Sequence, residues 1–155
     1  MSAPAPSVAE LKATLPRGKR LLGLDVGEKT IGLALSDTTL TVASPMATLL
    51  RVKFAKDVER IRAIVTEQGV GGFVVGLPIN MDGSEGPRCQ SVRQFGANLL
   101  EKIDLPLIFW DERLSTAAVT RTLLEADMSR KRRRETVDKM AAAYILQGAL
   151  DAARG

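Results

Sequence analysis

The sequence predicts an α/β fold: a mixed five-stranded sheet with helices on both faces. The first observation is an apolar run at 21–26, followed after a short polar turn by a second run at 31–35, which is the pattern of a β-hairpin. The second is a change to helical spacing at 54–65. The third is a pair of short apolar runs, 73–77 and 105–110, each directly after a helical segment. Three consecutive strands followed by alternating helices and strands give one mixed sheet.

The run at 21–26 is the strand around which the other elements are arranged. Its side chains alternate with a period of two, and Asp25 adds a carboxylate just before the run ends. The second run at 31–35 and a third strand at 41–50 complete an antiparallel meander. We expect the first strand in the middle of the sheet, next to the strand that ends at Trp110.

The helices are predicted from apolar residues at helical spacing and from the glycines and prolines that end such segments. They are expected at 54–68, about 85–102, 115–126 and 136–153. Residues 1–18 contain several prolines and are expected to form a flexible tail, while residues 19–155 form a single domain.

The amino-acid composition narrows the possible chemistry. The 155 residues include no histidine and one cysteine, Cys89. Histidine-based triads, histidine-ligated zinc and an internal disulfide are therefore excluded, and catalysis would rest on carboxylates, hydroxyls, basic side chains or a hard metal ion.

The net charge of +4 modestly favours an anionic partner. The sequence shows neither a membrane-spanning run nor a signal peptide, so we expect a cytoplasmic protein, as a monomer or a homodimer.

Acidic residues are expected to meet at one edge of the sheet, because ligands of open α/β sheets lie beyond the carboxyl ends of the strands. Asp25 ends the first strand, and Asp111 and Glu112 end the last one; the residues alone do not say which of these two points inward. Asp138 is expected in the first turn of the last helix, where small residues at 141–142 would let the helix approach the sheet. Three hard oxygen ligands without histidine suit Mg²⁺ or Mn²⁺, and a pair of such ions supports phosphodiester hydrolysis.

Each of these acids also has a simpler interpretation. Asp25 could be a solvated residue that starts a turn, and Asp138 could be a charge that favours the start of a helix.

A run of five basic residues, 130–134, comes just before the last helix. It is expected to be a mobile basic loop that binds a phosphate backbone beside the acidic site, although such runs are often only solvated loops. Aromatic residues are few, so recognition by backbone and shape is favoured over base stacking. The side chains expected to contact phosphates are Lys29, Arg113, Arg130, Lys131, Arg132, Arg133 and Arg134.

Four segments in order resemble the YqgF/RuvX family, the Holliday-junction-resolvase-like nucleases of the RNase H-like superfamily. The resemblance covers about residues 19–152. The matching segments are Gly23-Leu24-Asp25-Val26-Gly27 with Ile31-Gly32-Leu33-Ala34, Val75-Gly76-Leu77-Pro78-Ile79-Asn80-Met81-Asp82-Gly83, Asp111-Glu112-Arg113-Leu114-Ser115-Thr116, and Val137-Asp138 with Ala141-Ala142-Tyr144-Ile145-Leu146-Gln147.

The resemblance implies an RNase H-like fold and a divalent-metal nuclease with Asp25, Glu112 and Asp138 as its acidic triad. It also implies maturation of the 5′ end of pre-16S ribosomal RNA, with cleavage of branched DNA as an alternative. Two rival hypotheses remain: a non-catalytic ribosome-assembly or nucleic-acid-binding module on the same fold, and an actin-like ATPase. The ATPase class needs a second Asp-x-Gly domain, for which 155 residues leave no room.

Overall fold

The computed structural model describes residues 7–114 and 130–154, with side-chain detail for 7–114 and 138–153. Its centre is a mixed five-stranded sheet in the order β3-β2-β1-β4-β5. The first three strands pair antiparallel, and β1–β4 and β4–β5 pair parallel. The strands are β1 Arg20–Val26, β2 Thr30–Ser36, β3 Ala43–Leu50, β4 Val70–Leu77 and β5 Leu107–Asp111. The predicted fold class is confirmed.

The expected neighbour of the first strand was wrong. β1 does occupy the middle of the sheet, but β4 separates it from β5. All eight residues of β4 are buried, whereas the second half of β5 is only half-buried. A strand that is apolar throughout gains most from two flanking strands, because both of its edges and both of its faces are then covered. The short β5 therefore takes the edge of the sheet.

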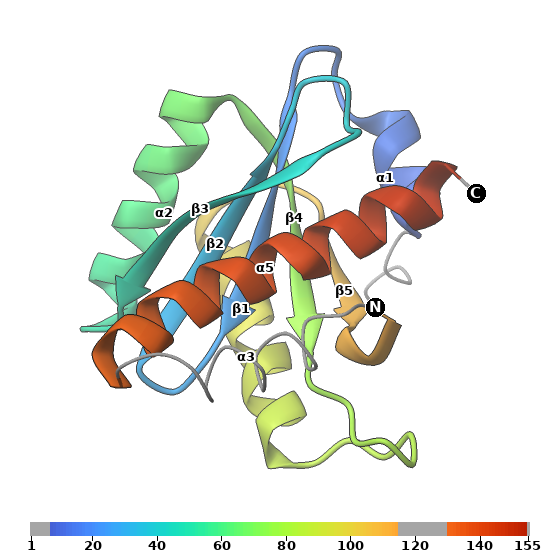
Figure 1. Cartoon of the computed structure of the whole chain (residues 1–155). Coiled ribbons are helices and arrows are strands. Elements are labelled where there is room, and N and C mark those ends of the chain that lie inside the picture. The colour runs from blue at the N-terminus through green and yellow to red at the C-terminus, as the bar shows by residue number, and fades with distance from the viewer. Residues whose placement is uncertain (1–6, 115–129, 155) are drawn as a thin grey trace.

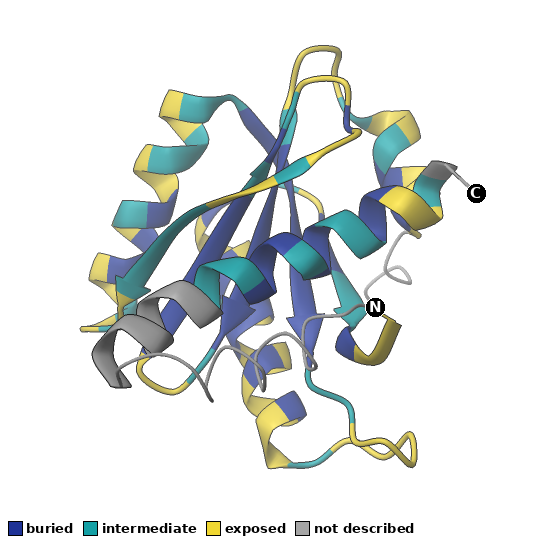
Figure 2. Ribbon diagram, viewed as in Figure 1, coloured by how far each residue is buried: buried dark blue, intermediate teal, exposed yellow. Residues whose placement is uncertain are grey.

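Helices cover both faces of the sheet (Figure 1). One face packs against α2 (Phe54–Gln68) and α3 (Pro87–Lys102), and the other against α1 (Val8–Thr14) and α5 (Arg130–Arg154). Figure 2 shows the consequence: the strands β1, β2 and β4 are mostly buried, whereas the edge strands β3 and β5 are largely half-buried. Cys89 lies in the core on the α3 side, where burial raises the pKa of its thiol.

Helix α5 lies directly on the backbone of the central strands, because glycines replace side chains beneath it. A Cβ atom added at Gly23 would lie 2.8 Å from the Cβ of Leu146, and one at Gly32 would lie 2.0 Å from the carbonyl oxygen of Asp138. Ala142, fully buried, faces the same glycine surface. The expected close approach of this helix through small residues is confirmed.

Two elements differ from the sequence-based expectations. The last helix begins at Arg130, six residues before the expected start at 136. Part of the expected N-terminal tail forms α1, whose Leu11 is fully buried against the α5 side of the core. This stretch is stabilised by an N-cap, since the Ser7 hydroxyl accepts the backbone N–H of Glu10 at 3.1 Å. The helix expected at 115–126 lies outside the described residues.

No helix in the described parts of the chain combines the length and the apolar character needed to cross a membrane.

Candidate active site at the carboxyl ends of the strands

The three parallel strands β1, β4 and β5 end at the same edge of the sheet. The first half of α5 crosses this edge, and the loop that follows β4 lies beside it (Figure 1). Ligand sites of α/β sheets form at such an edge, because loops and strand ends can present polar groups there without breaking the sheet.

Asp25 lies on the α5 face of the sheet. It is directly opposite Gly32 in the antiparallel β1–β2 pair. Residues that are opposite each other in such a pair point to the same face, and the side of Gly32 that would carry a Cβ faces α5. The Asp25 side chain therefore points toward α5 although it is only 6% exposed.

Asp138 approaches the same point from α5. Its backbone lies against Gly32, and its carboxylate accepts a hydrogen bond from the hydroxyl of Thr30. Thr30 is buried at the start of β2, two residues before Gly32 on the same face of the strand. Gly32 thus lies between the two acids. Asp25 is beside it in the sheet, and Asp138 is above it on α5.

The expected position of Asp138 in the first turn of the last helix was wrong. Asp138 is the ninth residue of α5, more than two turns from its start, and the dipole acts mainly within the first turn. What positions the Asp138 carboxylate is Thr30, a residue that periodicity alone does not single out.

Thr30→Val tests this contact. Valine keeps the shape of the side chain and removes the hydroxyl, which leaves a half-buried carboxylate without that donor. We expect the free energy of unfolding to fall by about 1–3 kcal/mol, measured by urea denaturation. Thr30→Ser keeps the hydroxyl and is the matched control. A loss in the valine variant no larger than in the serine variant would show that the bond does not hold Asp138.

Glu112 and Asp111 have different environments at the end of β5. Glu112, 6% exposed, opens a short 3-10 helix, η1 (Glu112–Leu114). Asp111 forms an ion pair with Arg113, with 2.7 Å between Oδ2 and Nη2. The hydrogen bonds from Arg113 lower the pKa of the Asp111 carboxyl. Asp111 is therefore engaged by a neighbouring cation, while Glu112 is the buried acid of the pair.

Glu112 lies farther from Asp25 than the sequence-based strand order implied. Because β4 lies between β1 and β5, the backbones of β1 and β5 are about 10 Å apart. Within residues 7–114 and 138–153, no three acidic side chains lie close enough together to form a metal cluster. The structure thus brings Asp25 and Asp138 together around Gly32 and places Glu112 at the same edge of the sheet.

The donors at this edge are hard oxygens: two carboxylates on one face and the Thr30 hydroxyl beside them. Mg²⁺ is commonly bound by one or two carboxylates, with water and substrate phosphates as the other ligands. Asp25 and Asp138 could hold such an ion, and Glu112 could join them through a water molecule or a small movement of η1.

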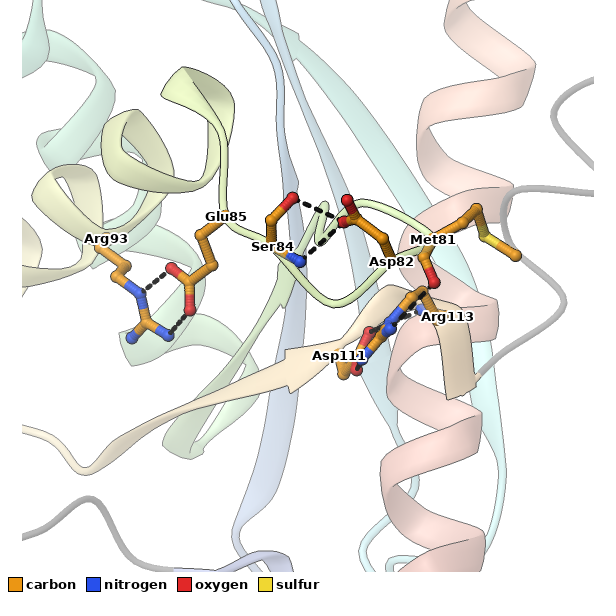
Figure 3. A network of polar contacts seen from close by, with 7 residues as sticks. All are labelled: Met81, Asp82, Ser84, Glu85, Arg93, Asp111 and Arg113. Atoms are coloured by element: carbon orange, nitrogen blue, oxygen red, sulfur yellow. Dashed lines mark hydrogen bonds and ion pairs between the residues drawn. The ribbon is translucent and has the colours of Figure 1, made fainter.

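A loop with several internal hydrogen bonds borders this edge at residues 78–86, and Figure 3 shows some of its contacts. Asp82 accepts hydrogen bonds from the backbone N–H and the hydroxyl of Ser84, at 2.9 and 2.6 Å, and these bonds lower the pKa of its carboxyl. Arg113 donates to the carbonyl of Met81 at 3.5 Å while it is held by Asp111. Sequence composition identified the loop, but not Arg113, which pairs with Asp111 of β5 and donates to the Met81 carbonyl in the loop.

The basic residues are arranged differently from the expected loop. The backbone of residues 130–134 forms the first turns of α5 and not the expected loop, and the side chains of these residues lie outside the described detail. Lys29 is exposed in the β1–β2 turn, as expected of a phosphate contact. Arg113 is exposed at the edge but already paired with Asp111.

Comparison with known proteins identifies the family. The RuvX family model, described as a Holliday junction resolvase, matches residues 19–152. The chain belongs to the RuvX family. Two curated relatives bear the name "Putative pre-16S rRNA nuclease". The relative from Paramagnetospirillum magneticum is 68% identical over 143 residues, covering 92% of each chain. The relative from Caulobacter vibrioides is 56% identical over 154 residues, covering 98% of this chain and 99% of that protein.

Solved structures show that this RuvX-family chain has the RNase H-like fold of the RuvC-type resolvases. T. thermophilus RuvC in complex with a Holliday junction substrate superposes with a TM-score of 0.52 at 13% identity, over 88% of this chain and 96% of that one. The yeast mitochondrial Holliday junction resolvase Ydc2 gives 0.51 at 11% identity, over 93% and 82%. At such identities the likeness concerns the fold alone. The family and fold implied by the sequence motifs are confirmed.

Proposed function

We propose that this RuvX-family chain is a cytoplasmic, divalent-metal-dependent endonuclease that cleaves structured nucleic acid, with the 5′ region of pre-16S ribosomal RNA as its substrate. The observation that carries the proposal is the convergence of Asp25 and Asp138 on the two sides of Gly32, at the carboxyl edge of an RNase H-like sheet. Asp25 and Asp138 bring two hard carboxylate groups to the same point. They form a site suited to a hard cation.

Each acidic residue has a proposed role. Asp25 and Asp138 would hold Mg²⁺ or Mn²⁺ from β1 and α5, and Glu112 would complete the site from η1. Such an ion supplies Lewis-acid chemistry for phosphodiester hydrolysis. Thr30 orients the Asp138 carboxylate.

The basic residues would hold the substrate. Lys29 extends from the turn next to Asp25, and Arg113 is placed by Asp111 beside the loop at 78–86. The cations of residues 130–134, on the first turns of α5, would contact phosphates farther from the scissile bond.

The choice of ribosomal RNA is supported by the names of relatives that are 56–68% identical over nearly their whole length. The alternative substrate is branched DNA, supported by the description of the matching family model. A non-catalytic assembly factor is the third candidate, and the presence of acids at 25, 112 and 138 weighs against it.

The deciding experiment is cleavage of precursor 16S ribosomal RNA and of a four-way DNA junction, side by side, with Mg²⁺, with Mn²⁺ and with EDTA. We expect metal-dependent cleavage in the 5′ precursor region of the RNA and weaker cleavage of the junction. Preferential cleavage of the junction would establish the resolvase alternative. Binding of both ligands without turnover in either metal would overturn the enzymatic proposal.

A further inference from the structure

A groove opens at the same end of the sheet as the acidic site, on the opposite face. Its first part, with a volume of about 520 Å³, lies between the β1–β2 turn, the end of β3 and the starts of α2 and α3. A second hollow of about 550 Å³ continues along α3 and shares Arg51, Phe54 and Ser91 with the first. We call the two together the α2–α3 groove, lined among others by Gly27, Arg51, Phe54, Arg88, Ser91 and Phe95.

The groove begins where the strand that carries Asp25 ends. Gly27 and Glu28, just after β1, form part of its wall. Arg51 joins this turn to the groove, because its Nη1 donates to the carbonyl of Gly27 at 2.6 Å and its backbone N–H donates to the carbonyl of Lys29 at 2.8 Å. A chain leaving the acidic edge over the β1–β2 turn would therefore enter the groove directly.

The charge of the groove favours an anion. Arg51 and Arg88 line it, and Arg88 is exposed at the start of α3. Of the two acids in the wall, Asp57 forms an ion pair with Arg60, with 2.5 Å between Oδ1 and Nη2. The same carboxylate accepts a hydrogen bond from the backbone N–H of Val52. Glu28, exposed in the turn, is the remaining negative charge. Two arginines against one unneutralised acid leave the described wall of the groove net positive.

An aromatic surface accompanies the arginines. The Arg51 guanidinium lies over the ring of Phe95, 5.3 Å from its centroid, which fixes the orientation of the cation. Phe54 packs against Phe95 in an edge-to-face arrangement, with 5.6 Å between the ring centroids, and it lines both hollows. A narrow basic groove with an aromatic side chain is typical of single-stranded nucleic-acid binding, where cations contact phosphates and rings contact bases.

The size of the groove suits a single strand. Each hollow lies within the range of small-ligand pockets, roughly 300–1,000 Å³, which is room for a nucleotide or two. Building on the proposed nuclease function, we propose that a single-stranded extension of the substrate leaves the acidic edge over the β1–β2 turn and lies in the α2–α3 groove. Arg51 and Arg88 bind its phosphates, and Phe54 contacts a base.

The test measures binding of the full chain to fluorescent RNA hairpins and their DNA counterparts, in EDTA, by anisotropy. The hairpins carry no extension, or single-stranded extensions of about four or about eight nucleotides on either end. We expect extensions on one end to tighten binding. Arg88→Glu should remove most of that gain and weaken binding about fivefold to tenfold. It should also reduce the slope of the logarithm of the binding constant against the logarithm of the salt concentration by about one.

The matched control is Arg17→Glu, the same charge change at an exposed arginine before β1, at the opposite end of the sheet. Folding of Arg88→Glu is expected to be intact, because an acid is favourable in the first turn of a helix. Equal weakening by both variants for all hairpins, or no gain from any extension, would overturn the groove proposal. An RNA-only gain would assign the groove to RNA, and equal gains would assign it to the shared phosphate backbone.

Cleavage is measured separately, so the two proposals can fail independently. An extension-dependent gain that Arg88→Glu removes, without any metal-dependent cleavage, would support the groove and refute the nuclease. Metal-dependent cleavage, together with binding that is indifferent to extensions and to Arg88→Glu, would refute the groove and leave the nuclease standing.

Discussion

Asp25→Asn is expected to reduce metal-dependent cleavage at least about a hundredfold while leaving nucleic-acid binding intact. The substitution keeps the size of the side chain and removes its charge at the end of β1, where it lies beside Gly32 and below Asp138. An amide is a poor ligand for a hard divalent ion compared with a carboxylate. Cleavage is measured with the precursor RNA in Mg²⁺ and in Mn²⁺, and binding is measured in EDTA.

The control for this variant is Asp104→Asn. Asp104 is exposed just before β5, at the opposite end of the sheet, so the same chemical change should leave the cleavage rate close to that of the native chain. Full activity in Asp25→Asn would remove Asp25 from the site. A parallel loss of binding would instead mean that the carboxylate supports the fold of the β1–β2 turn.

Gly32→Ala is expected to lower the free energy of unfolding by about 3 kcal/mol or more and to reduce cleavage. The new Cβ would lie 2.0 Å from the carbonyl oxygen of Asp138 and 3.0 Å from the backbone nitrogen of Lys139. Both atoms belong to the backbone of α5, so no side-chain rotation relieves the overlap and the helix must move away. That movement also separates Asp138 from Asp25. Urea denaturation and the cleavage assay measure the two effects.

Two other glycines provide the comparison. A Cβ at Gly76 would lie 2.4 Å from the Cδ1 atom of Ile145, the end of a flexible side chain, so Gly76→Ala should cost less than Gly32→Ala. A Cβ at Gly86 would meet only Asn80 at 3.6 Å, an ordinary contact, so Gly86→Ala should cost only what alanine costs at the N-cap of α3, well below the cost of Gly32→Ala. If all three variants lose the same stability, the close approach of α5 at Gly32 is not what limits the substitution.

The acidic site was predictable in part because it follows from local rules. Asp25 stands at the end of a strand with a clear period of two, and the carboxyl ends of parallel strands are where ligands bind. The choice between Asp111 and Glu112 was not available from local pattern, because it depends on Arg113, whose side chain folds back to pair with Asp111. The close approach of the helix that carries Asp138 was expected, but the place of Asp138 in the first turn was wrong, and the contact of its carboxylate with Thr30 was not foreseen.

The basic run was misjudged for a related reason. Five consecutive cations have no apolar period, so they give no sign of helix, yet the backbone of residues 130–134 continues α5 toward its N-terminus. A helix that is already anchored by its later residues extends at little cost, because each added residue forms a hydrogen bond on an existing turn. The anchor is the buried stretch that includes Ala142, Ile145 and Leu146.

Local sequence was sufficient for the hairpin, the alternation of helices and parallel strands, and the acids that end β1 and β5, because periodicity and turn residues act over a few neighbouring positions. Tertiary structure alone decided that β4 lies between β1 and β5, and that α5 rests on Gly32 with Asp138 over Asp25. These arrangements depend on which buried surfaces fit each other across more than a hundred residues of chain. Such complementarity is a property of packed volumes and not of any one segment.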